Sequence, residues 1–271
     1  MRYDPIKRSI GDVARKSPLL RKVLYFLLGL LFLREWYVKA ELRKILSKSN
    51  GKSVSVLDAG SGFGQYAYFI AKTFKNASVC AVDVKAEQID DCHRFFQQEN
   101  LRNATFAVQD LTTIERENEF DVILSVDVME HILEDEKVFR NFYRALKPGG
   151  VLIVNTPSDL SEDHDHHGDG SSSFIEEHVR DGYSPKELAE KLAKAGFENA
   201  RIAYTYGFWG NLYWHLALKY PMMMLGVSKA FFLVLPIYYL FTFPFALLFM
   251  LLDFSVKNET GTGLMAVAKK Q

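Results

Sequence analysis

The feature that most constrains the fold is an apolar run that leads into three alternating glycines. Residues 54–57 are apolar or small, segment 58–64 reads Asp-Ala-Gly-Ser-Gly-Phe-Gly, and a helical pattern then spans residues 65–74. Glycine lets a backbone turn sharply and approach a ligand, and the start of a helix presents unpaired N–H groups. A strand, a glycine turn and a helix in this order predict the first unit of an open α/β sheet, with a ligand at the turn.

The chemistry of this turn argues against a dinucleotide. The dinucleotide fingerprint needs a glycine at position 65, where this chain has Gln65. Asp58, at the mouth of the turn, would repel a pyrophosphate and attract a cation. S-adenosylmethionine, a nucleoside that carries an ammonium and a sulfonium, fits this turn better.

Further strands follow at the spacing of a doubly wound sheet. Residues 77–84 form a predicted strand ending near Asp83, where an acid accepts hydrogen bonds from a ribose diol in such folds. The predicted strand 105–108 precedes Gln109 and Asp110, a polar pair suited to an adenine edge. Predicted strands 120–126 and 151–157 flank a helix at 134–146 and a Lys-Pro-Gly-Gly turn at 147–150. Residues 200–206 and 264–269 supply two more strands.

These motifs resemble, in order and spacing, the core of a class I S-adenosylmethionine-dependent methyltransferase across residues 53–157. The resemblance implies an α/β fold: a Rossmann-like, doubly wound, seven-stranded mixed sheet of order 3-2-1-4-5-7-6, with helices on both faces. It implies that S-adenosylmethionine is the cofactor. Ser61 departs from the cysteine or glycine frequent in the family, but it is small enough to fit. The implied cofactor-binding residues are Asp58, Gly60, Ser61, Gly62, Gly64, Asp83, Val84, Gln109, Asp110, Leu111 and Ser125.

Candidate catalytic residues lie after the fourth and fifth strands. His131 ends an Asp-x-x-Glu-His segment, and His167 belongs to a histidine-rich loop at 161–173 that we expect to cover the acceptor. His178 and Tyr183 precede a helix that is capped by Ser184 and contains Glu187 of a capping box. Histidine is the usual base near neutral pH. The alternatives are a solvated polar loop and, for Tyr183, a packing role.

The Asp-x-x-Glu-His segment also permits a metal site. Asp127, Glu130 and His131 are spaced like the residues that can hold a divalent ion in quinone-precursor O-methyltransferases, and carboxylates with an imidazole could bind Mg²⁺. The same Glu-His pair occurs in this fold without a metal, where the histidine caps the cofactor pocket or acts as a base.

Charge and cysteine content limit the partners. Lysine plus arginine equals aspartate plus glutamate at 33 each, so no global field favours nucleic acid, and we expect no nucleic-acid partner. Cys80 and Cys92 are the only cysteines, and we interpret them as reduced packing residues in a cytosolic setting. The sequence leaves the oligomeric state open.

The N-terminal region combines basic and apolar residues. Seven lysines and arginines and two aspartates precede Arg34, and residues 23–33 are apolar. Eleven helical residues reach about 16 Å, too short for a bilayer core of about 30 Å. A signal peptide is the alternative, but Arg34 and Glu35 follow without small residues for cleavage. We predict helices over the cofactor side within residues 1–50.

A second apolar tract, residues 230–252, carries no charge over 23 positions and is long enough to span a bilayer. It lies between the two last predicted strands, which are antiparallel neighbours in the resembling family. The insertion must therefore leave and return on one side of a membrane. Residues 208–228 include His215, Lys219 and Pro221, which disfavour a second crossing. We predict a monotopic helical pair; packing within a soluble protein or a dimer interface is the alternative.

We therefore predict an N-terminal region (1–50), a methyltransferase core (51–207), an inserted apolar lobe (208–257) and a last core strand (258–271). The predicted activity is methyl transfer to a lipid-like or isoprenoid acceptor at the cytoplasmic face of a membrane, to which the protein attaches peripherally or monotopically. A methyltransferase for a soluble small molecule and a non-catalytic membrane-bound scaffold remain alternatives.

Overall fold

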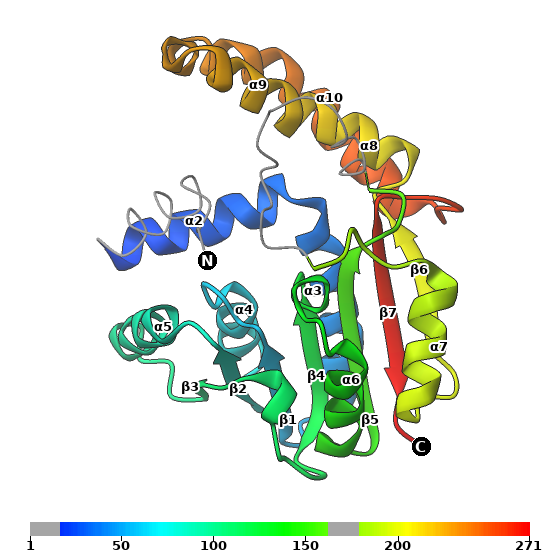
Figure 1. The fold of residues 1–271 in the computed structure, drawn as a ribbon. Helices are drawn as coiled ribbons and strands as arrows, with labels where there is room; N and C mark the ends of the chain where they lie inside the picture. Colours follow the sequence, from blue (N-terminus) through cyan, green and yellow to red (C-terminus); the bar gives the residue numbers. More distant parts are fainter. Residues whose placement is uncertain (1–16, 162–178) are drawn as a thin grey trace.

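A computed structural model of the chain describes residues 17–161 and 179–271. Its centre is a seven-stranded sheet of order β3-β2-β1-β4-β5-β7-β6, which confirms the predicted topology (Figure 1). β7 runs antiparallel to both of its neighbours, and the other strand pairs are parallel. The strands are β1 (Val54–Ala59), β2 (Ala77–Asp83), β3 (Ala104–Val108), β4 (Phe120–Val126), β5 (Leu146–Pro157), β6 (Arg201–Thr205) and β7 (Gly263–Lys269).

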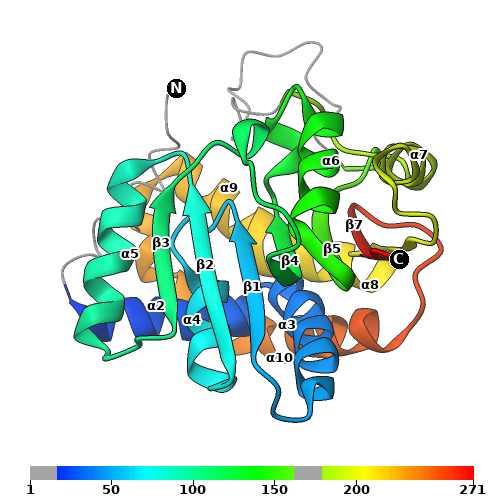
Figure 2. The ribbon, with the colours of Figure 1, turned by 90° about the horizontal axis from the view of Figure 1, so that it is seen from below.

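Helices cover both faces of the sheet, as Figure 2 shows. One face packs against α6 (Asp135–Ala145) and α7 (Pro185–Ala195), and the other against α3 (Leu33–Leu46), α4 (Gln65–Thr73) and α5 (Ala86–Gln98). The central strands are apolar on both sides because both sides are buried, as expected for a mainly parallel sheet. Short 3-10 turns are η1 (Ser47–Ser49), η2 (Leu111–Thr113) and η3 (Met129–His131).

One local prediction differs from the structure. The sequence predicts a Lys-Pro-Gly-Gly turn before the fifth strand, but β5 already begins at Leu146. Leu146 pairs with Phe120 of β4, and the register shifts before Val151 pairs with Val122. The glycines therefore form an irregularity within the strand, since glycine accommodates the bulged backbone that this shift requires.

The N-terminal helices meet at a bend. α2 (Pro18–Leu31) is capped by the Ser17 hydroxyl, and the extended backbone of Phe32 separates it from α3. α3 packs on the sheet, whereas α2 runs across the edge at which the parallel strands end (Figure 1).

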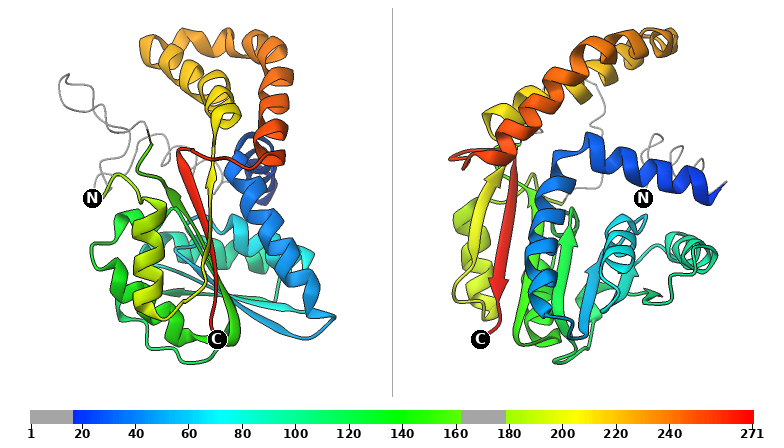
Figure 3. Two further views of the ribbon diagram at one scale, coloured as in Figure 1. Left: turned by 90° about the vertical axis from the view of Figure 1, so that its right-hand side faces the viewer. Right: turned by 180° about the vertical axis from the view of Figure 1, so that it is seen from behind.

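An all-helical lobe is inserted between β6 and β7. It consists of α8 (Phe208–Trp214), the π-helical turn η5 (His215–Lys219), α9 (Tyr220–Val227), the 3-10 turn η6 (Lys229–Leu233) and α10 (Leu235–Ser255). Figure 3 shows that the chain runs outward through α8 and α9 and returns along α10, so both ends of the lobe meet the same edge of the sheet. The division of the chain into four regions stays a prediction.

A buried carboxylate fastens the base of the lobe to the core. Asp253 is fully buried and accepts hydrogen bonds from the Gly210 backbone N–H (2.9 Å) and the Tyr37 hydroxyl (2.8 Å). A small apolar cluster around Leu33 and Tyr213 surrounds this junction. Farther out the lobe is exposed: α10 is long and apolar enough to cross a membrane, and it is the one such helix in the described ranges. In its most apolar stretch of 18 residues, only 11% of the residues are buried.

Candidate functional site

The glycine turn after β1 needs glycine for two different reasons. Gly60 has φ +82°, and a Cβ there would lie 2.3 Å from Val128 Cγ2. Gly64 (φ +74°) is similarly close to Cys92 Sγ, at 3.0 Å. Gly62 (φ +52°) faces open space, with no atom within 4 Å of an added Cβ. The outer glycines therefore allow tight packing, while the middle one leaves room beside the turn.

Asp83 holds this turn in place from the end of β2. Its Oδ2 accepts a hydrogen bond from the Gly62 N–H (2.9 Å), and its Oδ1 accepts one from the Lys85 N–H (3.0 Å). Each carboxylate oxygen has two lone pairs, so the group retains acceptor capacity for a ribose diol.

The remaining predicted cofactor residues lie along the same edge. The Gln109 N–H donates to the Asp83 carbonyl (3.0 Å), and the Asp110 carboxylate caps η2 by accepting from the Thr112 N–H (2.8 Å). Val84 is exposed and Leu111 is buried beneath the edge. These contacts place the predicted adenine-side pair next to the predicted ribose acid.

The residues present fit S-adenosylmethionine. The buried hydroxyls of Ser61 and Ser125 have no hydrogen-bond partner within the part of the chain that the structure describes. Because buried polar atoms are normally paired, they are suited to a polar ligand. The Ser61 hydroxyl belongs to the glycine turn, and with the open space at Gly62 and the carboxylate of Asp83 it gives this turn a polar surface suited to a nucleoside.

Asp58 differs from the other acids of the site in its burial. Only 2% of the residue is exposed, and its Oδ2 accepts a hydrogen bond from the Ala67 N–H (3.1 Å). Burial raises the pKa of Asp58 from 3.8 to about 7, the hydrogen bond from Ala67 opposes this, and the negative charges of Asp83 and Glu35 add to the rise. A bound cation would favour the ionised carboxylate.

This shift predicts how stability depends on pH without the cofactor. The unfolded chain ionises Asp58 near pH 3.8, whereas the folded chain retains the proton up to about pH 7. The unfolded state therefore binds fewer protons in this window, and stability falls as pH rises through it. Replacing Asp58 with asparagine should remove part of this fall, on the order of 1–3 kcal/mol. Urea unfolding across the window measures it, with Asp121→Asn as control; equal pH slopes for wild type and Asp58→Asn would contradict it.

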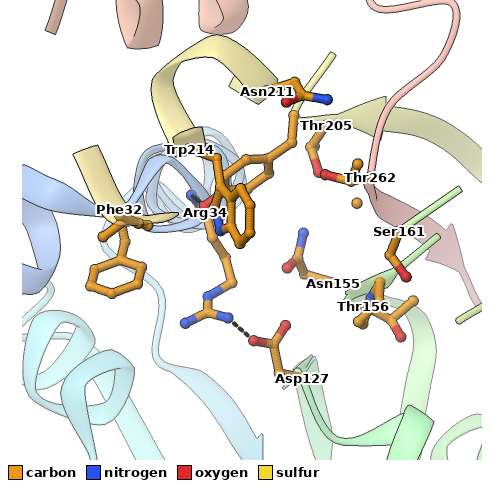
Figure 4. Close-up of a pocket in the computed structure, with 14 residues that line it drawn as sticks. Phe32, Arg34, Asp127, Asn155, Thr156, Ser161, Thr205, Asn211, Trp214 and Thr262 are labelled. Atoms are coloured by element: carbon orange, nitrogen blue, oxygen red, sulfur yellow. Dashed lines mark hydrogen bonds and ion pairs between the residues drawn. The ribbon is translucent and has the colours of Figure 1, made fainter. Parts of the chain in front are cut away.

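A cavity of about 280 Å³ lies at the carboxyl ends of β4 and β5, between the core and the lobe (Figure 4). Asn155 and Thr156 from the end of β5 form part of its wall. Phe32 from the α2–α3 bend and Trp214 and Leu218 from the lobe form another part. The position outside the carboxyl ends of the strands is the usual place for a ligand in an open α/β sheet.

One ion pair lines this cavity. Figure 4 shows the guanidinium of Arg34 directed toward the carboxylate of Asp127, and the two form a salt bridge. The Arg34 backbone N–H also donates to the Tyr206 hydroxyl (3.0 Å), which ties the start of α3 to the end of β6. Asp127 has φ +50°, in the left-handed region that aspartate enters more readily than most residues other than glycine.

The proposed catalytic role of Tyr183 does not agree with the structure. The residue is fully buried, its hydroxyl lies 2.7 Å from Asp135 Oδ2, and burial followed by the Asp135 contact raises its pKa far above the usual range. Arg180 and Lys191 also pair with Asp135. Tyr183 is therefore part of a buried polar cluster inside the core, where an acceptor has no access.

The structure also does not gather the predicted metal ligands. Asp127 pairs with Arg34, while the buried Glu130 accepts a hydrogen bond from the Thr156 hydroxyl (3.2 Å). In the described ranges no group of three or more His, Cys, Asp or Glu side chains is arranged to hold a metal ion. The His131 ring lies 4.0 Å from Glu130 and remains partly exposed at η3. His167 and His178 lie outside the described residues.

Apart from Asp127, the residues that line the cavity were not among the site residues predicted from the sequence. Asn155 and Thr156 lie at the end of a predicted strand, and this position was a usable signal. Arg34 follows the N-terminal apolar run and had no such signal. Polar residues at the carboxyl end of a central strand lie at the ligand edge. Arg34 reaches the site only because the chain bends at Phe32.

The sheet order, the glycine turn and the acid at the end of β2 define a class I methyltransferase fold. Comparison with known proteins agrees: the profile of the family described as "Methyltransferase domain" matches residues 50–205. The chain belongs to this family, its cofactor is S-adenosylmethionine, and the domain is that of an S-adenosylmethionine-dependent methyltransferase.

Similar proteins include a phosphoethanolamine N-methyltransferase of Triticum aestivum, 31% identical over 53% of this chain and 28% of that protein. A ubiquinone biosynthesis O-methyltransferase of Coxiella burnetii is 30% identical over 39% of this chain and 44% of that protein. The chain thus spans less than half the length of these relatives. A putative sarcosine dimethylglycine methyltransferase from Galdieria sulphuraria shares the fold, with a TM-score of 0.56, 18% identity and coverage of 88% of this chain and 84% of that one.

Proposed function

We propose that this methyltransferase acts on a lipid-like or isoprenoid acceptor, which it draws from the cytoplasmic face of a membrane while attached peripherally or monotopically. One observation carries the proposal: the cavity beside the cofactor edge is walled partly by the lobe, whose outer helices are apolar and exposed. A lipid could leave the bilayer along the lobe with its polar end directed into the cavity.

The outer surface of the lobe is unlike that of a soluble helix. Its exposed large apolar side chains include Leu233 (83%), Leu240 (71%) and Phe241 (68%). Contiguous apolar patches of this kind mark membrane or protein contacts. Burial of one such side chain contributes roughly 1.5–3 kcal/mol, so several of them together favour stable insertion into one leaflet.

The chemistry then rests mainly on positioning. When bound, S-adenosylmethionine supplies a methyl group already activated by its sulfonium, so the protein must hold the acceptor in line and exclude water. Trp214, Leu218 and Phe32 provide an apolar wall for this purpose, and Arg34 and Asp127 provide a polar one. If the acceptor is a hydroxyl, the candidates among the described residues to take its proton are Asp127, which lines the cavity, and His131 of η3.

Two other functions remain as candidates. The relatives are named for phosphoethanolamine and for ubiquinone biosynthesis, so both a soluble and a membrane-derived acceptor are represented among them. With a soluble acceptor, the lobe would serve dimerisation. A scaffold that has lost transfer is disfavoured by the intact glycine turn and the acids Asp58, Asp83 and Asp110.

The lobe surface provides the test. Replacing Leu233, Leu240 and Phe241 with glutamine should weaken binding to phospholipid vesicles by about 100-fold or more, because three inserted side chains are lost. Affinity for S-adenosylmethionine should not change, since these residues lie far from the glycine turn. Co-sedimentation measures the first quantity and calorimetry the second.

Turnover identifies the acceptor class. Wild-type protein is incubated with a total lipid extract and methyl-labelled S-adenosylmethionine, and labelled lipids are identified by mass spectrometry. The triple variant should label them far more slowly, whereas Leu133→Gln, an equally exposed leucine on the core, should match wild type. Label found only in water-soluble acceptors, at equal rates for all three proteins, would overturn the lipid proposal in favour of a soluble acceptor.

A further inference from the structure

One face of α2 is fastened to the middle of the glycine turn. The Arg21 guanidinium, 3% exposed, donates to the Phe63 carbonyl (2.7 Å) and to Asp91 Oδ2 (2.9 Å). The Tyr25 hydroxyl donates to the same Phe63 carbonyl at 2.5 Å. Phe63 stands between Gly62 and Gly64, so α2 directly holds the backbone of the cofactor turn.

The opposite face of α2 is apolar and exposed. Residues 19, 20, 23, 26 and 27 recur at the three- and four-residue spacing that places them on one side of a helix. The most exposed of them are Leu19 (65%) and Phe26 (67%). The buried polar contacts of Arg21 and Tyr25 therefore face the cofactor turn, and the apolar side chains face away from it.

A lipid bilayer is the occupant that this face fits. α2 and the lobe project over the same edge of the sheet, as Figures 1 and 3 show, and Phe32 at the end of α2 lines the cavity together with lobe residues. The Trp36 and Phe254 rings join α3 to the base of α10 at 6.1 Å. The end of α2 thus adjoins the base of the proposed membrane-binding lobe. In sequence, residues 1–16 carry five lysines and arginines against two aspartates, a basic excess that suits anionic lipid.

We infer that α2 is a membrane-contact surface that couples bilayer binding to the cofactor site. The inference rests on the membrane attachment proposed above. A bilayer that binds the apolar face of α2 favours the position of α2 in which Arg21 and Tyr25 donate hydrogen bonds to the Phe63 carbonyl. These hydrogen bonds order the glycine turn. Because such coupling is reciprocal, vesicles raise the affinity for S-adenosylmethionine, and the cofactor raises the affinity for vesicles by the same factor.

Calorimetric titration of the whole chain with S-adenosylmethionine tests this, with and without vesicles of phosphatidylcholine and phosphatidylglycerol. Vesicles should tighten binding about fivefold or more, the usual lower range of coupling between sites. Tyr25→Phe, which removes only the hydroxyl, should reduce this factor while co-sedimentation with vesicles persists through the lobe. Phe26→Ser should reduce it with no change in affinity in the absence of vesicles.

Arg94→Leu serves as the control, since Arg94 also faces Asp91 (3.6 Å) but is exposed and does not reach the turn. Its coupling factor should equal that of wild type. An unchanged affinity of wild type with vesicles that demonstrably bind the protein would overturn the inference and leave the proposed function standing. If the protein did not bind vesicles at all, both the inference on α2 and the proposed membrane attachment would be wrong. A dimer in the absence of lipid that Phe26→Ser dissociates would assign the α2 face to a second copy.

Discussion

Replacement of Asp83 with alanine is expected to weaken binding of S-adenosylmethionine by about 1.5–3 kcal/mol, roughly one to two orders of magnitude. Two effects combine. The variant loses the acceptor predicted for the ribose hydroxyls, and the Gly62 N–H loses the Oδ2 that now holds the turn (2.9 Å). Calorimetry with S-adenosylmethionine measures the loss.

Asp121→Ala provides a matched control. Asp121 also accepts a hydrogen bond from a backbone N–H, that of Ser55 (2.7 Å). It lies near the start of β4, beside the start of β1, and therefore at the end of the sheet remote from the glycine turn. Its replacement should leave cofactor affinity within experimental error of wild type. Asp83→Asn should fall in between, because the amide oxygen can still accept from Gly62. A folded Asp83→Ala variant with unchanged affinity would show that the ribose is bound elsewhere.

Replacement of Asp135 with alanine is expected to lower the free energy of unfolding by about 3–5 kcal/mol, the usual effect of removing one partner from a buried ion pair. Asp135 is 3% exposed, and its Oδ2 contacts Arg180 Nη1 (2.5 Å), Lys191 Nζ (2.6 Å) and the Tyr183 hydroxyl (2.7 Å). Without the carboxylate, Arg180 and Lys191 would lie side by side next to the core, with only the more exposed Glu187, 3.1 Å from Lys191, as a counter-charge. Urea denaturation measures the change.

The neighbouring Glu136 allows a direct comparison. It pairs with Lys194 at 3.2 Å, but both side chains are exposed, and such pairs contribute about 0–1 kcal/mol. Glu136→Ala should therefore hardly move the unfolding midpoint. If the two variants lost similar stability, the Asp135 cluster would not be acting as a buried charge network. If Tyr183→Phe lowered turnover without lowering stability, a catalytic role for Tyr183 would return.

The sheet could be predicted because its determinants are local. The apolar run before Asp58, the alternating glycines and the acid near the end of the next strand are read within a few dozen residues, and their meaning depends on backbone geometry that sequence dictates directly. The same holds for the Ser184 cap of α7, whose hydroxyl accepts from the Glu187 N–H as the capping box requires. Order and direction of the strands then follow from the resemblance to the family.

The acceptor side could not be read in this way. The Asp-x-x-Glu-His spacing is compatible with a metal site. In the structure, however, Asp127 forms a salt bridge with Arg34, and Glu130 accepts a hydrogen bond from Thr156. Tyr183, next to a helix start that should face the crevice, turns inward because Asp135 lies within hydrogen-bond distance in the core. Spacing along the chain places residues near an edge, but packing against other elements decides which way their side chains point.

The apolar tracts show the same division. Composition and length alone indicate that residues 230–252 are apolar enough and numerous enough to cross a bilayer as a helix, and that residues 23–33 are too few. In the structure this helix is α10 (Leu235–Ser255), and the 3-10 turn η6 precedes it. Only the tertiary structure decides that the polar contacts of α2 reach the cofactor turn and that lobe residues line the cavity. The physical reason is that hydrophobicity is a property of each residue. A cavity, or a contact such as that of α2 with the glycine turn, exists only between segments that folding brings together.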